Sequence, residues 1–270
     1  MTASIEDLRG ELQRLGRVVV AFSGGADSSL LAKVARDTLG RSAVLCATAL
    51  SPSLAGVEEE DCRALADEWD LRWVGVPTTE MHDPTYVANG ADRCARCKTA
   101  LMDALGPLAA DEDATVVLGV NVSDLGDHRP GQAAAAAAGA VFPFVEIGFT
   151  KDDIRSWSRT LGLRTWDKPA AACLASRLPY GTPVTLGRLA EVESAEAALR
   201  ALGFGQLRVR HHGEAARLEF EPSALAEVIA RRDEVVAAVR RAGFTFVALD
   251  LEGFRSGSLN RVLRGGEGAP

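Results

Sequence analysis

The chain has 270 residues and a net charge of −7, and 47% of its residues are hydrophobic against 25% charged. A chain of this size and composition can bury a substantial core as one large or two smaller globular domains. No apolar run is long enough to cross a bilayer, and the acidic balance argues against an extended nucleic-acid interface. Five cysteines, an odd number, fit a reducing cytoplasm better than a disulfide framework.

Strand and helix patterns alternate through residues 1–167. This alternation predicts a doubly wound, mostly parallel α/β sheet, in which ligands bind beyond the carboxyl ends of the strands. The expected strands are residues 18–22, 43–50, 71–76, 116–120 and 141–145, and the expected helices include residues 1–16, 57–69 and 151–161.

The first strand ends in a glycine turn that continues at once into a helical pattern. Backbone amides at Gly24 and Gly25 would point out from the helix N-terminus, which suits a phosphate group, and Ser23 and Ser28 add hydroxyl donors. Asp27 places a carboxylate beside that phosphate, so a cation between them is expected, and Mg²⁺ is the most suitable. A plain helix cap by Asp27 and Ser28 is the alternative.

The fourth strand delivers polar side chains to the same edge of the sheet. Asn121, Asp124 and Arg129 all follow this strand. We therefore expect them near the glycine turn, because the carboxyl ends of parallel strands share one edge.

The five cysteines fall into three sets. Cys46 and Cys62 lie within a predicted strand and helix, so we expect small core residues. Cys94 and Cys97 lie two residues apart at a loop-to-helix junction, where a metal, a cluster or a redox disulfide would all suit the spacing. Cys173 lies in the irregular stretch 166–181, which looks like a domain junction and a functional loop.

Residues 168–270 predict a smaller α+β domain that follows this junction. The two histidines at its centre, His211 and His212, are expected at the surface. The expected order is a helix at 186–202, strands at 206–211 and 215–220, a helix at 222–242 and a strand at 245–251.

Basic residues favour this smaller domain as the anion-binding part. Residues 168–270 contain 14 Lys and Arg and 12 Asp and Glu, whereas residues 1–167 contain 16 Lys and Arg and 25 Asp and Glu. Arg208 and Arg210 alternate along one strand and so share a face. With Arg177 and Arg255 they would form an anion pocket, although a solvated strand edge is the alternative.

Six motifs occur in order along the chain: Ser23-Gly24-Gly25-Ala26-Asp27-Ser28, Asp92-Arg93-Cys94 with Cys97-Lys98, Asp124 to Gly131, Lys168-Pro169 to Gly181, Arg208-Val209-Arg210, and Gly253 to Ser258. Taken together, these motifs resemble the LarE sulfur transferases of the PP-loop ATP pyrophosphatase superfamily, from about residue 18 to residue 262. The resemblance implies a PP-loop ATP-binding domain at 1–167 and a substrate-binding domain at 168–270.

The resemblance also implies a reaction. Members of the family use ATP and Mg²⁺ to adenylylate the carboxylates of pyridinium-3,5-biscarboxylic acid mononucleotide, release pyrophosphate, and form thiocarboxylates for the nickel-pincer cofactor of lactate racemase. A carboxylate is a poor acyl donor until its oxygen leaves as AMP, and a sulfur nucleophile then attacks. The implied partners are this small nucleotide and a sulfide or sulfur donor, and a homo-oligomer is expected as in the family.

Residue roles follow from the same resemblance. The implied catalytic residues are Cys173, Asp27, Ser176 and Arg177. Arg208, Arg210 and Arg255 would bind the substrate phosphate. The implied ATP-binding residues are Ser23, Gly24, Gly25, Asp27, Ser28, Thr48, Asn121, Asp124 and Arg129.

Two sulfur sources are known in the family. Cys94, Cys97 and Cys173 supply three thiolates, which fits the form that holds a [4Fe-4S] cluster with one iron free to carry sulfide. A zinc site fits less well, since no histidine lies at a matching spacing. In the alternative form, Cys173 alone gives up its own sulfur.

Other functions stay open from the sequence. Amidation by a PP-loop enzyme would need ammonia rather than three thiols, and tRNA thiolation would need a broader basic surface. A nucleotide-binding sensor without catalysis would keep the glycine turn but would need neither Asp27 nor the three cysteines.

Overall fold

The computed structural model describes residues 4–125, 130–169 and 172–255. The chain forms two compact units, one within Met1–Tyr86 and Asp92–Ala171, the other within Val87–Ala91 and Ala172–Pro270. The second unit therefore takes a short internal segment from the first half of the chain. None of the helices in the described ranges is both long and apolar enough to span a membrane.

The first unit is built on a four-stranded, all-parallel sheet with the order β3-β2-β1-β4. This arrangement confirms the expected α/β class. The strands are β1 (Val18–Ala21), β2 (Val44–Leu50), β3 (Arg72–Pro77) and β4 (Thr115–Val117).

The expected fifth strand at residues 141–145 is wrong. Only Val141 forms a parallel bridge, to Val117, and a short helix, α7 (Pro143–Glu146), begins two residues later. Proline lacks an N–H for a sheet ladder but is well suited to the first position of a helix. Pro143 therefore ends the apolar run as a helix start.

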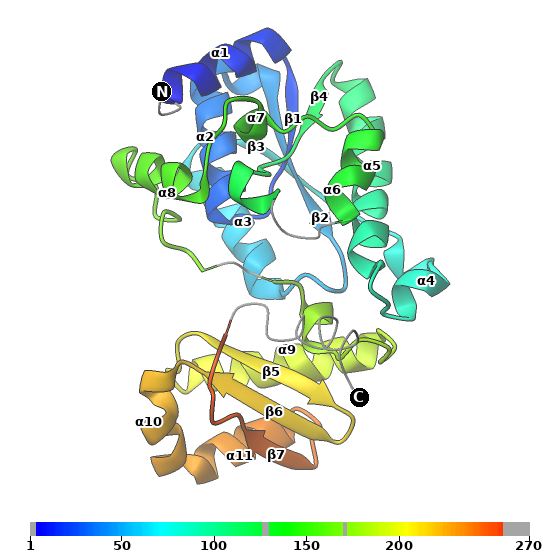
Figure 1. Cartoon of the computed structure of the whole chain (residues 1–270), viewed down its shortest axis with the longest axis vertical. Coiled ribbons are helices and arrows are strands. Elements are labelled where there is room, and N and C mark those ends of the chain that lie inside the picture. Colours follow the sequence, from blue (N-terminus) through cyan, green and yellow to red (C-terminus); the bar gives the residue numbers. More distant parts are fainter. Residues whose placement is uncertain (1–3, 126–129, 170–171, 256–270) are drawn as a thin grey trace, which may run out of the picture. The chain divides into compact units, whose positions relative to one another are not determined.

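Helices cover both faces of this sheet, with α2 and α8 on one side and α5 and α6 on the other (Figure 1). Alternation along β1 creates the two cores, because Val18 and Val20 pack with the α2 side and Val19 with the α5 side. The helices are α1 (Ile5–Leu15), α2 (Ala26–Leu39), α3 (Gly56–Glu68), α4 (Pro84–Val87), α5 (Arg93–Asp111), α6 (Pro130–Ala137) and α8 (Lys151–Thr160), with 3₁₀ turns η1 (Arg41–Ala43), η2 (Glu80–His82) and η3 (Val122–Asp124).

The cysteines predicted to be core residues are indeed buried. Cys46 in β2 and Cys62 in α3 are both fully inaccessible to solvent. Burial raises the pKa of the Cys46 thiol to about 12 and that of the Cys62 thiol to about 11. Both thiols are therefore protonated and unreactive at neutral pH.

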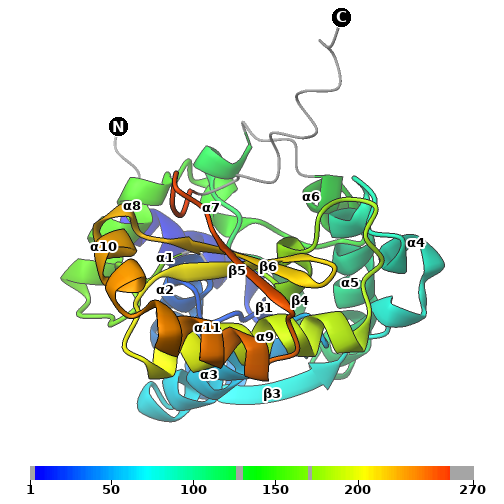
Figure 2. The same ribbon diagram turned by 90° about the horizontal axis from the view of Figure 1, so that it is seen from below.

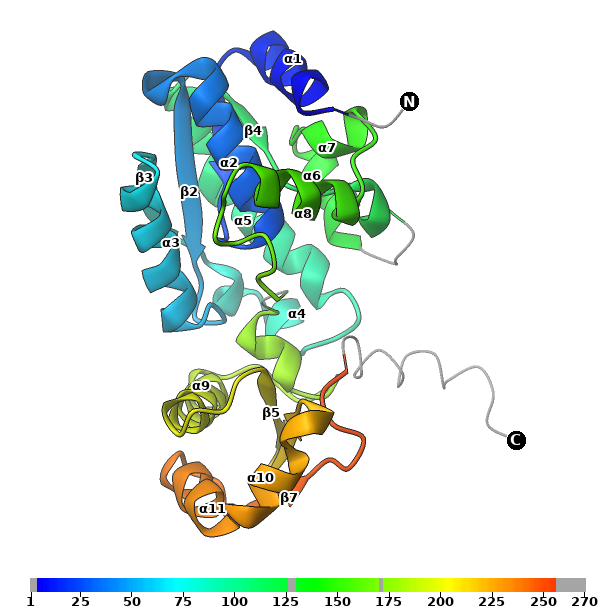
Figure 3. The ribbon, with the colours of Figure 1, turned by 90° about the vertical axis from the view of Figure 1, so that its left-hand side faces the viewer.

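The second unit has a three-stranded sheet with the order β5-β6-β7, antiparallel between β5 and β6 and parallel between β6 and β7. Two helices, α9 and α11, lie side by side on one face of this sheet (Figures 2 and 3). The elements are η4 (Leu174–Arg177), α9 (Leu186–Ala201), β5 (Leu207–His212), β6 (Ala215–Phe220), η5 (Pro222–Ala224), α10 (Leu225–Ala230), α11 (Arg232–Arg241) and β7 (Phe246–Leu249).

Two expectations for this unit are corrected. The single helix expected at 222–242 is three pieces, because Arg231 adopts φ −102° and ψ 23° and breaks the helix between α10 and α11. His211 is not a surface residue, since only 3% of it is exposed and its Nε2 lies 2.8 Å from a Glu191 carboxylate oxygen.

Candidate functional site

The turn between β1 and α2 has the geometry of an anion-binding loop. Gly24 adopts φ 65°, a left-handed conformation that favours glycine. Gly25 is the N-cap of α2 and no side chain caps this helix start, so its backbone N–H groups and positive dipole end face the turn. The Ser28 hydroxyl accepts a bond from the Ser23 amide at 3.2 Å and donates to the Gly25 carbonyl at 3.2 Å. It therefore closes the turn internally.

Neighbouring strands hold this turn in place. The buried Thr48 hydroxyl on β2 donates to the Phe22 carbonyl at 2.7 Å and accepts from the Trp73 indole at 2.8 Å. Beyond β4, Gly119 lies so close to α2 that an added Cβ would come within 3.0 Å of the Asp27 carbonyl carbon and the Ser28 nitrogen. A side chain at Gly119 would push the first turn of α2 out of place.

Asp27 lies at the centre of a polar network on the first turn of α2. The Lys151 ammonium contacts its Oδ2 at 2.5 Å, and the Asn121 amide donates to its Oδ1 at 3.3 Å. Asn121 also donates to Asp124 at 2.9 Å. The structure thus brings Asp27, Asn121 and Asp124 together as predicted, and it adds Lys151, which the sequence did not single out.

A second lysine lies beside the glycine turn. The Lys168 ammonium is 3.7 Å from the position of a Cβ on Gly24, and it donates to Glu58 at 2.7 Å and to Asp61 at 2.6 Å. Burial disfavours its charge, but these two carboxylates outweigh burial and raise the pKa of Lys168 above its ordinary value. Lys168 therefore stays a fixed cation next to the turn.

Cys94 and Cys97 lie on the first turn of α5, where three-residue spacing puts them on one face. Cys94 is exposed and Cys97 is partly exposed. Helix α6 approaches closely here, since a Cβ on Gly131 would lie 2.9 Å from the Cys94 carbonyl oxygen. Within the described ranges, no three His, Cys, Asp or Glu side chains gather into a metal-binding group.

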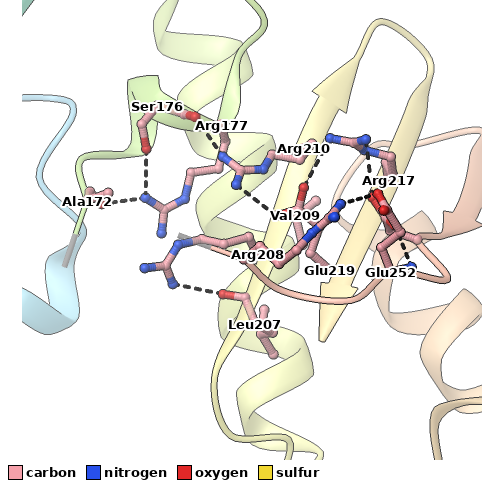
Figure 4. A network of polar contacts seen from close by, with 12 residues as sticks. Ala172, Ser176, Arg177, Leu207, Arg208, Val209, Arg210, Arg217, Glu219 and Glu252 are labelled. Carbon is pink, nitrogen blue, oxygen red and sulfur yellow. Dashed lines mark hydrogen bonds and ion pairs between the residues drawn. The ribbon is translucent and has the colours of Figure 1, made fainter. Parts of the chain in front are cut away.

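Cys173 lies at the N-cap of η4 with an exposed thiol and a firmly held backbone. Its carbonyl oxygen accepts bonds from the Ser176 hydroxyl at 2.7 Å, the Ser176 amide at 2.9 Å and the Arg177 guanidinium at 2.9 Å. Arg177 also donates to the Ala172 carbonyl. In this structure, Ser176 and Arg177 thus position the Cys173 segment. Figure 4 shows the Arg177 guanidinium with Ala172 and Ser176.

A buried ion pair anchors Arg177. Its guanidinium forms a bidentate pair with Glu196 of α9, at 2.9 and 3.0 Å, and the two residues are 3% and 1% exposed. Glu196 also accepts from Arg200 at 2.8 Å and from the Val209 amide at 3.1 Å. Burial raises the pKa of Glu196, but the bonds from Arg177 and the other donors outweigh it and hold that pKa below its ordinary value. Glu196 does not stand out in the sequence, where it looks like an ordinary acidic helix residue.

Arg208 and Arg210 of β5 lie beside Arg177 in a concentration of positive charge (Figure 4). Burial lowers the pKa of Arg208 to about 10, and repulsion from Arg177 adds to this effect. The Arg210 guanidinium donates to the Ser176 carbonyl at 2.9 Å and to Glu219 at 2.7 Å. Arg255 forms an ion pair with Glu252.

Asn89 is a second structural residue that does not stand out in the sequence. It is fully buried at φ 57°, and its amide donates to the carbonyls of Pro179 at 2.8 Å and Thr182 at 2.9 Å. Its own carbonyl accepts from the Gly181 amide at 3.0 Å. Asn89 therefore joins the internal segment of the second unit to the loop that follows Cys173. Arg129, a predicted ATP ligand, lies outside the described residues.

The parallel sheet flanked by helices places the first unit among the α/β proteins and is consistent with a PP-loop fold. No family model matches the chain. It is 44% identical to an uncharacterized protein of Synechocystis, over 97% of this chain and 99% of the relative. It is also 38% identical to the pyridinium-3,5-bisthiocarboxylic acid mononucleotide synthase of Lactiplantibacillus plantarum, over 93% and 92%. An uncharacterized protein of Methanocaldococcus jannaschii is 25% identical over 89% and 91%.

The similarity to the Lactiplantibacillus enzyme covers nearly all of both chains. The chain therefore belongs to the LarE family of sulfur transferases.

Proposed function

We propose that this protein converts the carboxylates of pyridinium-3,5-biscarboxylic acid mononucleotide to thiocarboxylates, for the nickel-pincer cofactor of lactate racemase. The observation that carries the proposal is the near full-length similarity to the bisthiocarboxylic acid mononucleotide synthase. The glycine turn with Asp27 and the fixed segment with Cys173 give this chain both halves of the chemistry, activation and sulfur transfer.

The first half of the reaction is carboxylate activation in the domain at 1–167. A substrate carboxylate oxygen attacks the α-phosphorus of ATP, the α–β phosphoanhydride bond breaks, and pyrophosphate leaves. The turn from Ser23 to Ser28 would hold the phosphates through backbone amides. Asp27 fits Mg²⁺, because it is a carboxylate on the first turn of α2, beside the glycine turn that would hold the phosphates. Thr48 would lie near adenine, with Asn121, Asp124 and Arg129 completing the nucleotide site.

The second half of the reaction concerns the domain at 168–270. We propose that Arg208, Arg210 and Arg255 bind the substrate phosphate. Their position supports this assignment, because Arg208 and Arg210 lie on one strand beside Arg177. Ser176 and Arg177 would act by fixing the backbone that carries Cys173.

For the sulfur source we propose a [4Fe-4S] cluster bound by Cys94, Cys97 and Cys173. Exposure supports this choice of cysteines, since Cys94 and Cys173 are exposed and Cys97 is partly exposed, whereas Cys46 and Cys62 are buried. When bound, a cluster with three cysteine ligands supplies an open iron that can carry sulfide.

Sacrificial donation is the alternative. Here the Cys173 thiolate attacks the adenylylated carbonyl, AMP leaves and a thioester forms. Loss of the Cys173 α-proton then breaks its Cβ–S bond, which releases the thiocarboxylate and leaves dehydroalanine in the chain.

Pyrophosphate release tests the activation step. The protein should release pyrophosphate from ATP only with the pyridinium dicarboxylate mononucleotide, and release with an amidation substrate or a tRNA instead would assign a different PP-loop reaction. ATP binding without any pyrophosphate release would indicate a sensor.

Iron and sulfide analysis after anaerobic reconstitution tests the sulfur source. The cluster proposal expects bound iron that is lost in Cys94→Ala. A folded preparation without iron, with Cys173 lighter by hydrogen sulfide after turnover, would establish the sacrificial route. We further propose a cytoplasmic homo-oligomer, as expected for the family.

A further inference from the structure

Asp27 belongs to a closed ring of four residues from three elements of the first unit. The Lys151 ammonium contacts Asp27 Oδ2 at 2.5 Å, and the Lys151 backbone amide donates to the Ser123 hydroxyl at 3.1 Å. The Ser123 amide donates to the Asn121 side-chain oxygen at 3.0 Å, and the Asn121 amide returns to Asp27 Oδ1 at 3.3 Å. Each carboxylate oxygen of Asp27 is thus engaged by this ring.

This ring conflicts with a metal ion on the same carboxylate. Mg²⁺ binds through one or two carboxylates together with nucleotide phosphates. A metal ion at Asp27 would lie next to the Lys151 ammonium, and two cations on one half-buried carboxylate repel each other. Either the metal ion is excluded or the ammonium leaves.

The backbone of Lys151 is fixed, whereas its side chain is held only at its ammonium end, by Asp27. Lys151 is the first residue of α8, whose N-terminus is secured by a capping box between Thr150 and Asp153. Its four-carbon stem is flexible and ends in a compact charge with three donors. The side chain is about one third exposed, so its ammonium can turn from Asp27 to an adjacent phosphate without moving the helix.

We propose that Lys151 exchanges Asp27 for phosphate when the nucleotide binds. Its ammonium neutralises Asp27 and suppresses metal binding without nucleotide; with Mg²⁺ and ATP it releases the carboxylate to the metal ion and contacts phosphate oxygens. This inference rests on the nucleotide site of the proposed function. It assigns to Lys151 the ordering of metal and nucleotide binding.

Manganese titrations followed by electron paramagnetic resonance test the exchange, with Mn²⁺ replacing Mg²⁺. In Lys151→Met, Mn²⁺ alone should bind about fivefold more tightly, since the Asp27 carboxylate is no longer held in an ion pair. Mn²⁺ with ATP should bind about tenfold more weakly, since a charge-assisted phosphate contact is lost. The matched control is Lys33→Met, which breaks an ion pair with Asp37 on the same helix as Asp27 and should change neither affinity. Adding Asp27→Asn to Lys151→Met should abolish the tighter binding of Mn²⁺.

Opposite changes in the two affinities distinguish exchange from other roles of Lys151. If Lys151→Met weakened Mn²⁺ binding equally without and with ATP, the role of Lys151 would be purely structural and the proposal would be overturned. An unchanged affinity in either titration would also overturn it. The titrations contain no sulfur acceptor, so a protein that shows the exchange but transfers no sulfur would refute only the proposed function.

Discussion

Replacing Arg177 with methionine should destabilise the C-terminal unit far more than an exposed arginine replacement on the same carboxylate. Arg177→Met leaves Glu196, only 1% exposed, with two of its four hydrogen bonds. Removing one partner of a buried ion pair costs about 3–5 kcal/mol. Arg200→Met removes a partner whose side chain is 37% exposed, so it should cost below about 1 kcal/mol.

The four tryptophans allow the two units to be followed separately. Trp69, Trp73, Trp157 and Trp166 all belong to the first unit. Urea unfolding should therefore be recorded by both tryptophan fluorescence and far-ultraviolet circular dichroism. Arg177→Met should move part of the dichroism transition to lower urea and leave the fluorescence midpoint unchanged.

A double variant isolates the buried charge. Adding Glu196→Gln to Arg177→Met should recover part of the lost stability, because a neutral amide leaves no unpaired charge in the interior. Equal small effects of Arg177→Met and Arg200→Met, or no recovery in the double variant, would refute the role given to this ion pair.

Three further predictions follow from burial and hydrogen bonding. A thiol reagent should modify three cysteines in the folded protein and spare Cys46 and Cys62 even at pH 9, because their pKa values are raised to about 12 and about 11; fast reaction of all five would contradict their burial. The pKa of Glu196 lies below its ordinary 4.5 in the folded protein, so its contribution to the free energy of unfolding is present above pH 4.5 and is lost as pH falls through the folded pKa. In acid titrations, the free energy of unfolding of Glu196→Gln should therefore depend less on pH than that of the unmodified protein. Parallel curves would contradict this linkage. Asn89→Ala should destabilise the C-terminal unit by about 3 kcal/mol, and Asn89→Gly by less, because glycine tolerates φ 57°. If urea unfolding showed Asn89→Gly to be the less stable variant, backbone strain at position 89 would be excluded as the cause.

Local sequence patterns predicted the elements that position the nucleotide site. The strand at Val18, the break at Gly24 and the helix that follows are encoded within about fifteen residues, and the structure has them as expected. The two thiols of Cys46 and Cys62 were also assigned to the core by pattern alone. The expected strand at residues 141–145 failed, because Pro143 converts an apolar run into a helix start.

Contacts between distant segments could not be predicted in this way. Lys151 meets Asp27 across 124 positions, and Asn89 meets Pro179 across 90. Neither residue stands out locally, since a lysine after a helix N-cap and an asparagine in a loop are ordinary. Arg177 was expected among the catalytic residues from the resemblance, whereas its contact with Glu196 shows how it supports the Cys173 segment.

The most direct test of the proposed chemistry follows the carboxylate oxygen. If the substrate is labelled with ¹⁸O in its carboxylates and turned over with ATP, adenylylation transfers one labelled oxygen to AMP for each sulfur incorporated. We expect AMP with one ¹⁸O and a matching thiocarboxylate product, and neither from Asp27→Asn. Unlabelled AMP, or ADP in its place, would contradict activation of the carboxylate at the Ser23–Ser28 turn.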